Sequence, residues 1–142
     1  MRAFCARMGA TVPQRKALVL KASRILLSEK PLPERLQAFL EALLEGPFPI
    51  RSGKLYLRKG EGLRLVAQLG GEAGGEEVAL SLEGGGRALG RLSLRLAPAA
   101  SLAPEDRLAL EEAAGILALA LLRERAERAE RVLRRAGECA TQ

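Results

Sequence analysis

Residues 104–136 read PEDRLALEEAAGILALALLRERAERAERVLRRA, and this stretch decides the fold. Pro104 suits the first turn of a helix, with Glu105 and Asp106 beside it at the positive end of the helix dipole. The first half of the stretch is apolar on most of its faces, so other elements should cover it. The second half, from Arg123 onward, is charged except for one stripe. We therefore expect one long helix that begins inside a domain and projects from it.

The stripe has the spacing of a coiled-coil seam. Glutamates stand four residues before arginines beside it, which predicts the ion pairs Glu124–Arg128, Glu127–Arg131 and Glu130–Arg134. A seam of about two heptads that contains alanine is weak alone, so Leu18, Ile25 or Leu121 should contribute to the same interface. The pattern favours a homodimer, although a helix of another protein could also pair with it. The seam residues alternate three and four positions apart: Leu119, Leu122, Ala126, Ala129, Leu133 and Ala136.

The composition predicts one domain without catalytic chemistry. The chain has 142 residues, 48% of them hydrophobic but only 3% aromatic, so the core must be aliphatic. It has no histidine, which removes the usual general base and the commonest metal ligand. Cys5 and Cys139 stand near opposite ends, without metal-ligand spacing. We expect no enzyme activity, no cofactor and no metal.

The sequence also suggests a compartment. Residues 1–10 lack the apolar region of a signal peptide, and the apolar run 116–122 is too short to span a bilayer. We expect a cytoplasmic protein with no membrane partner. Arginine outnumbers lysine by 18 to 5 and asparagine is absent, a composition that favours a thermophilic source.

Apolar periodicity divides the remaining chain into helices and strands. Residues 1–13 are predicted to be a flexible arm, residues 14–28 and 33–45 helices, and the break between the helices lies at Lys30–Pro33. The period then changes from 3.6 to 2, which predicts strands at 54–58, 63–69, 78–82 and 88–96 with glycine-rich turns. We therefore expect an α+β domain over 14–122 and a helical stalk and tail over 123–142.

The alternation assigns each strand residue to a face. We expect an antiparallel four- to five-stranded sheet with the N-terminal helices and the long C-terminal helix packed on one face. The covered face is predicted to carry Leu55, Leu57, Leu63, Leu65, Ala67, Leu69, Val78, Leu80, Leu82, Leu92, Leu94 and Leu96. The open face is predicted to carry Lys54, Tyr56, Arg58, Arg64, Val66, Gln68, Ser81, Arg91, Ser93 and Arg95.

In this order of elements the chain resembles a GAF domain. Residues 19–26 and 36–44 are similar to the paired entry helices of that family, and residues 53–70 to its first hairpin. Residues 86–95, 102–106 and 108–122 are similar to its closing strand, loop and helix. The resemblance covers most of residues 17–125. It implies a sensory or signalling module that acts as a homodimer whose terminal helices form a bundle.

The chain departs from the family between the first hairpin and the closing strands. Family members usually have an extra helix and loops there, which lid a ligand pocket on the face away from the terminal helices. Only about 20 residues, mostly Gly and Glu, fill this interval. Cyclic-nucleotide and bilin ligands are therefore not expected. Cys5 and Cys139 do not match the cysteines of the methionine-sulfoxide-reducing members, so no family site residue carries over.

Two alternatives use the sheet instead of the helices. Residues 1–60 carry 12 basic and 4 acidic residues, so a nucleic acid or another polyanion could bind the open face. A small ligand could instead bind a reduced pocket under residues 70–77. The candidate anion surface consists of Tyr56, Arg58, Arg64, Arg91 and Arg95.

Overall fold

The computed structural model describes residues 10–71 and 74–140. Its elements are three helices and four strands, in the order α2, α3, β1, β2, β3, β4 and α4. The α+β class predicted from the sequence is confirmed. Residues 1–9 of the predicted arm lie outside the described residues.

Two N-terminal helices precede the sheet. Helix α2 spans Val12–Leu26 and begins with a capping box: the Thr11 N–H donates to Gln14 Oε1 at 2.8 Å, and the Gln14 N–H donates to Thr11 Oγ1 at 3.3 Å. This cap places Val12 and Pro13 in the helix, so the prediction that the arm extends to residue 13 is wrong. Helix α3 spans Leu32–Glu45, with Pro33 in its first turn as predicted.

The four strands form one antiparallel sheet. They are β1 (Ile50–Lys59), β2 (Gly62–Gly70), β3 (Glu77–Gly84) and β4 (Arg87–Leu96), in the spatial order β2-β1-β4-β3. Gly85 and Gly86 have φ angles of 61° and 75° in the turn between β3 and β4, a conformation that favours glycine. The sheet thus has the smaller of the two strand numbers predicted.

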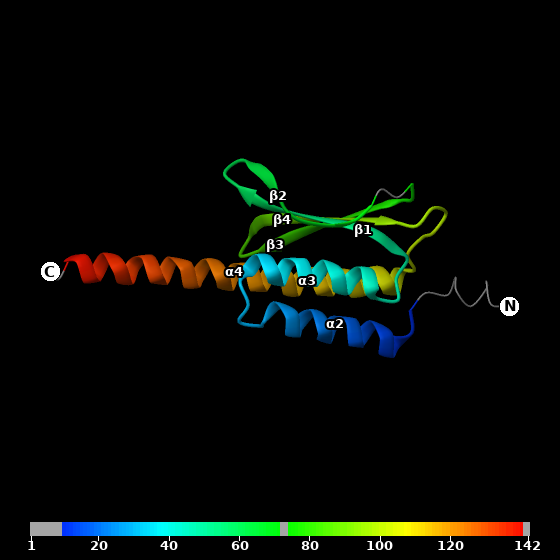
Figure 1. The fold of residues 1–142 in the computed structure, drawn as a ribbon, viewed down its shortest axis with the longest axis horizontal. Coiled ribbons are helices and arrows are strands. Elements are labelled where there is room, and N and C mark those ends of the chain that lie inside the picture. The colour runs from blue at the N-terminus through cyan, green and yellow to red at the C-terminus, as the bar shows by residue number, and fades with distance from the viewer. Residues whose placement is uncertain (1–9, 72–73, 141–142) are drawn as a thin grey trace.

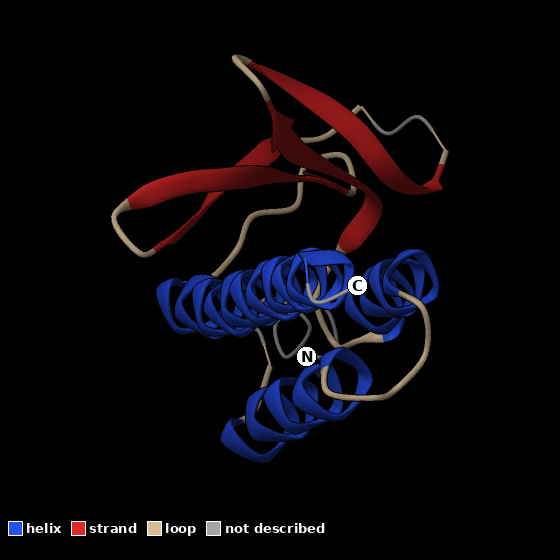
Figure 2. Ribbon diagram, turned by 90° about the vertical axis from the view of Figure 1, so that its left-hand side faces the viewer, coloured by secondary structure: helices blue, strands red, loops and turns tan. Residues whose placement is uncertain are grey.

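The helices lie in layers on one side of the sheet (Figures 1 and 2). Helices α3 and α4 pack against the strands, and α2 packs on α3 and α4. The described part of the chain places no helix over the other face, which we call the open face. The predicted arrangement, with all helices on one side, is confirmed. The core between the layers is aliphatic apart from Phe39 and Phe48, and its central members include Leu36, Leu40, Leu55, Leu92, Leu94, Leu110 and Leu117.

A bulge in the first hairpin overturns part of the predicted assignment of faces. Leu55 lies opposite Ala67, but Tyr56 lies opposite Leu65, so Val66 is an extra residue in β2. Residues opposite each other share a face of the sheet. Leu63 and Leu65 therefore lie on the open face, where they are 52% and 44% exposed. Arg64, opposite Leu57, lies on the helix side instead.

The last helix, α4, spans Pro104–Ala140 and projects from the domain (Figure 1). At 1.5 Å per residue, its 37 residues extend over about 55 Å. Buried side chains alternate with exposed ones as far as Leu121, and none of the side chains described beyond it is buried. The predicted change of character within this helix is confirmed.

Candidate functional site

The open face carries a hollow of about 650 Å³ at the ends of β2 and β3. Strand alternation aims Lys54 and Tyr56 of β1 and Ser93 and Arg95 of β4 outward on this face, beside Glu77 of β3. Glycines 70 and 71 form its rim. The hollow lies beside the residue range 70–77, where the sequence suggested a reduced pocket.

Glu77 balances the arginines of this face. Its carboxylate lies 3.5 Å from Arg91 Nη2 and 3.6 Å from Arg95 Nη2, and it accepts a hydrogen bond from the Ser93 hydroxyl at 2.6 Å. The bond from Ser93 lowers the pKa of the Glu77 carboxyl below its usual value, and the positive charges of Arg95, Arg91 and Lys54 lower it further. Ionised Glu77 therefore neutralises part of the positive charge that the sequence predicted here.

The structure places four of the five predicted anion-surface residues on the same face of the sheet. Tyr56 lies opposite Arg91, and Arg58 and Arg95 belong to the same face. The prediction that Arg64 joins them is wrong, because the bulge turns it to the other side of the sheet. The surface also includes Glu77, which the sequence analysis did not select. The alternation of Val78, Leu80 and Leu82 could have indicated it, since their neighbours must face outward.

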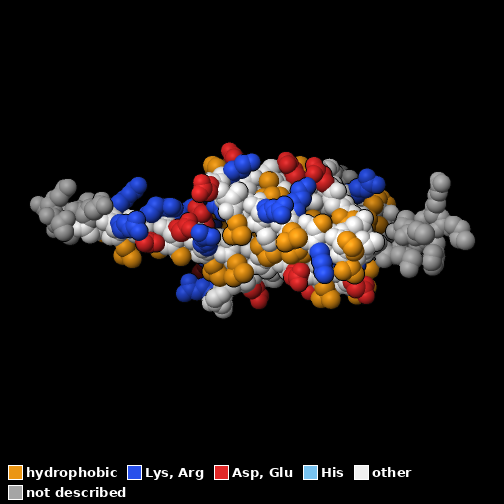
Figure 3. Space-filling view, turned by 90° about the horizontal axis from the view of Figure 1, so that it is seen from below, with side chains coloured by type: hydrophobic (Ala, Val, Ile, Leu, Met, Phe, Trp, Pro, Cys, Tyr) orange, Lys and Arg blue, Asp and Glu red, His pale blue; other side chains and the backbone are white. Residues whose placement is uncertain are grey.

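A second candidate surface lies on the outer helices. Leu108 and Leu119 of α4 are 63% and 67% exposed, and Val12 of α2, which lies beside Leu108, is 53% exposed. Figure 3 shows hydrophobic side chains gathered over this helical face and continuing at intervals along the projecting part of α4. We call the exposed line on α4 the apolar stripe. It comprises Leu108, Gly115, Leu119, Ala126, Ala129, Leu133 and Ala136.

The predicted dimer residues differ in how much of each side chain is exposed. Leu119, Ala126, Ala129 and Leu133 are exposed on the stripe. Leu122 is half-buried, with its side chain packed over Gly84. Leu18 and Leu121, only 4% and 5% exposed, belong to the core, and Ile25 packs against it. The prediction was that Leu18, Ile25 or Leu121 would contribute to the seam; Leu18 and Leu121 do not fit that role, because the chain buries them itself.

One of the three predicted stalk ion pairs forms. Arg134 Nη2 lies 2.7 Å from Glu130 Oε1. Glu127 instead contacts Arg123, one turn earlier, at 3.1 Å. Glu124 contacts Arg35 of α3 at 3.0 Å. Spacing along the sequence could not predict these partners. Glu127 has an arginine four residues away on each side, and the partner of Glu124 lies on another helix.

The described residues show no metal site and no membrane span. Histidine, cysteine, aspartate and glutamate do not cluster in threes anywhere in residues 10–71 and 74–140. No helix in these ranges is both long enough and apolar enough to cross a bilayer.

Comparison with solved structures identifies the fold as GAF-like. The chain is similar to a GAF domain assigned to a sensor histidine kinase of Pseudomonas syringae pv. tomato, with a TM-score of 0.69 and 19% identity over 82% of this chain and 93% of that one. It is equally similar to the GAF domain of a phosphoenolpyruvate-protein phosphotransferase (ptsP) from Coxiella burnetii, with a TM-score of 0.69 and 15% identity over 84% and 99% of the two chains. The fold expected from the resemblance is confirmed.

A third similar structure is an enzyme. Free methionine-R-sulfoxide reductase from Neisseria meningitidis, in complex with its substrate, has a TM-score of 0.69 and 18% identity over 83% of this chain and 95% of that one. No protein-family model matches the chain, and no curated protein matches it. Identities this low establish the fold alone, so the function must be argued from the residues themselves.

Proposed function

We propose that this protein is a non-enzymatic signalling module that acts as a homodimer through α2 and α4. In this proposal the apolar stripes of two copies pack together, and the projecting part of α4 forms a two-helix stalk. A signal that shifts the packing or register of the bundle is then passed along the stalk. The GAF domains of a sensor kinase and of a phosphotransferase among the similar structures agree with such a role.

The apolar stripe is the observation that carries the proposal. Leucines 108, 119 and 133 are each more than 60% exposed and lie on one line of one helix. Their positions fit the heptad seam extended backward into the domain, with Gly115 between the first two. Single exposed leucines are ordinary, but a line that continues from the domain into the stalk favours a helical partner. A second copy presents the same line by symmetry.

The residue types support the non-enzymatic part of the proposal. The sequence has no histidine, and its two cysteines stand at positions 5 and 139, far in sequence from the strands. Reduction of a sulfoxide by a protein requires a thiol that becomes oxidised. We therefore expect no methionine when the protein is incubated with free methionine sulfoxide and dithiothreitol. Turnover that disappears in a Cys5→Ser variant would contradict this part of the proposal.

A charge placed on the stripe tests the dimer. Leu119→Glu would bury two like charges in the interface, and the mass measured by light scattering at low micromolar concentration should fall from dimer to monomer. The matched control is Leu63→Glu, because Leu63 is 52% exposed on the open face and belongs to neither α2 nor α4. If both variants remain dimeric, or the unmodified chain is monomeric, the proposed interface is wrong.

The open-face hollow supports a second function, binding of a small ligand or a polyanion. Tyr56 lines the hollow and is the only tyrosine in a chain without tryptophan, so its fluorescence reports directly on binding there. A single-stranded oligonucleotide at low salt is the probe for a polyanion. Unchanged Tyr56 emission would remove the polyanion alternative, which the Glu77 ion pairs already weaken.

A further inference from the structure

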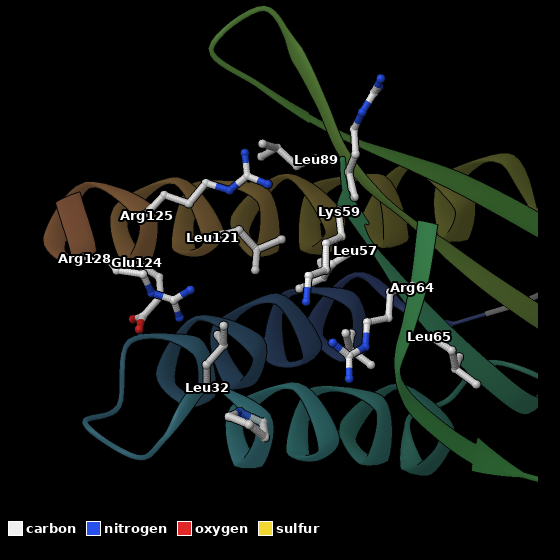
Figure 4. Close-up of a pocket in the computed structure, with 13 residues that line it drawn as sticks. Leu32, Leu57, Lys59, Arg64, Leu65, Leu89, Leu121, Glu124, Arg125 and Arg128 are labelled. Atoms are coloured by element: carbon white, nitrogen blue, oxygen red, sulfur yellow. The ribbon is translucent and has the colours of Figure 1, made fainter. Parts of the chain in front are cut away.

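A half-open pocket of about 480 Å³ lies on the helix side of the sheet, where α4 leaves the domain. Figure 4 shows the side chains that line it, coming from three directions. Leu121, Arg125 and Arg128 come from α4, and Leu32 from the start of α3. The end of the β1–β2 hairpin supplies Leu57, Lys59 and Arg64 on the opposite side. We call this space the junction pocket. Most of its lining lies on the helix side of the sheet, where Leu57 and Arg64 point, and Arg58 borders it from the end of β1.

The rim of the junction pocket carries an excess of positive charge. Its basic members are Arg58, Lys59, Arg64, Arg125 and Arg128, and its one acidic member is Glu124. Among the residues that the structure describes, none of these five contacts a carboxylate.

Two local features produce this excess. The bulge at Leu55/Tyr56 turns Arg64 from the open face into the pocket. Arg35 binds Glu124 at 3.0 Å, and both side chains are largely shielded from solvent, with 11% and 20% exposed. Arg128 thereby loses the partner four residues earlier that its sequence spacing offers. The cations are left facing one another across the pocket.

The floor of the pocket is apolar. Leu121 and Leu89 are 5% and 1% exposed, and Leu32, Leu57 and Val66 are half-buried. Its volume falls within the range of small-molecule sites, roughly 300–1,000 Å³. Small-molecule sites typically combine such an apolar floor with a few convergent polar groups.

We propose that the junction pocket binds a small amphiphilic organic anion, with its apolar body on the leucine floor and its carboxylate or similar head group among Lys59, Arg64, Arg125 and Arg128. Charge complementarity selects an anion, and the floor selects one with an apolar body. Inorganic phosphate would leave the leucines in contact with water, and a neutral apolar molecule would leave the cations unpaired. The head group would connect the hairpin to the first turns of the stalk. The proposal does not depend on the dimer or on the open face.

Titration calorimetry with three probes tests this chemistry. Decanoate has both an apolar chain and a carboxylate, decanol has the chain alone, and sulfate has the charge alone. We expect decanoate to bind, and to bind at least about fivefold more tightly than either other probe. In amide nuclear magnetic resonance spectra, the shifts caused by decanoate should lie at the pocket residues. Absence of binding up to low millimolar decanoate, equal binding of decanol, or equal binding of sulfate would each overturn the proposal.

A pair of charge-matched variants locates the site. Arg125→Gln/Arg128→Gln removes two rim cations at exposed helical positions, so the fold should persist, and decanoate should bind about fivefold to tenfold more weakly. The control Arg131→Gln/Arg135→Gln removes the same charge from the same helix outside the pocket and should leave the affinity unchanged. Equal losses in the two variants would mean nonspecific attraction to a basic helix and would refute the assignment of the site.

Discussion

At the scale of single residues, Asp106 joins two helices that are far apart in the sequence. It is the only aspartate of the chain and is 2% exposed. Its carboxylate accepts the Ala10 N–H at 3.2 and 3.3 Å and contacts Arg15 Nη1 at 3.3 Å. It also lies in the first turn of α4, where the helix dipole favours an anion. The sequence indicated only this last role, because spacing along the chain cannot show a contact between residues 10 and 106.

Replacement of Asp106 by Ala should therefore destabilise the fold strongly. The change leaves the buried Ala10 N–H without its acceptor and Arg15 without its counter-ion, and we expect a loss of about 3 kcal/mol in the free energy of unfolding. Urea denaturation measures it. Glu105→Ala, in the same turn but exposed, is the control and should cost less than about 0.5 kcal/mol. Similar midpoints for the two variants would show that the buried contacts contribute little.

Ionisation of Glu77 should make the stability of the fold depend on pH. Because its pKa is lowered in the folded state, ionised Glu77 stabilises the fold at pH values above the usual carboxyl pKa, and this contribution is lost as the pH falls through the lowered pKa. Thermal midpoints of the unmodified chain and Glu77→Gln should thus differ at neutral pH and converge in acid. Glu83→Gln on the same strand controls for the loss of one negative charge. A difference that persists undiminished in acid would contradict the assigned role of the ionised carboxylate.

At the scale of elements, the sequence predicted the features that periodicity determines and missed those that strand pairing determines. Pro33, Pro104 and the glycine turns mark boundaries by local chemistry, so the helices and strands were found nearly in place. The bulge could not be found in this way. Leu65, Val66 and Ala67 are consecutive apolar residues, and only the pairing with β1 shows that Val66 is the extra one. One extra residue sufficed to move Arg64 from one candidate site to another.

Close packing between strands makes Gly90 a strict requirement of β4. A Cβ atom there would lie 2.2 Å from the backbone oxygen of Tyr56, and backbone inside a sheet cannot move away easily. Gly90→Ala should lower the free energy of unfolding by about 2 kcal/mol or more.

The matched change in a helix should have the opposite sign. Gly115 is exposed in α4, and a Cβ atom at this position would meet no atom within 4 Å, so Gly115→Ala should stabilise by about 0.5–1 kcal/mol. Both substitutions are best compared by urea denaturation in the Leu119→Glu background, where association does not contribute. Equal effects at the two positions would mean that the strands around Gly90 can separate enough to admit a methyl group.

At the scale of the whole molecule, the chain forms a domain that buries its own core and also exposes an apolar stripe on α4. The α+β arrangement could be predicted, because apolar strand faces require helices to cover them. Which leucines remain exposed could not be predicted, because the apolar periodicity of a helix marks its apolar faces without showing which of them the chain covers. Only the three-dimensional packing shows that the chain buries Leu18 and Leu121 and leaves Leu119 outside.

Truncation after Leu122 separates these two parts. The domain core is complete at that point, so the shortened chain should fold, with a loss of about 1 kcal/mol because the Arg35–Glu124 ion pair is removed. Its association should weaken, since half of the apolar stripe is gone, and light scattering at low micromolar concentration should report a monomer. Truncation after Ala136, which keeps Leu133, should leave the full chain's mass unchanged apart from the deleted residues. If a chain ending at Leu122 remains fully dimeric, the copies associate through the domain, where Val12, Leu108 and Leu119 are exposed. The stalk would then be free to pair with a helix of another protein.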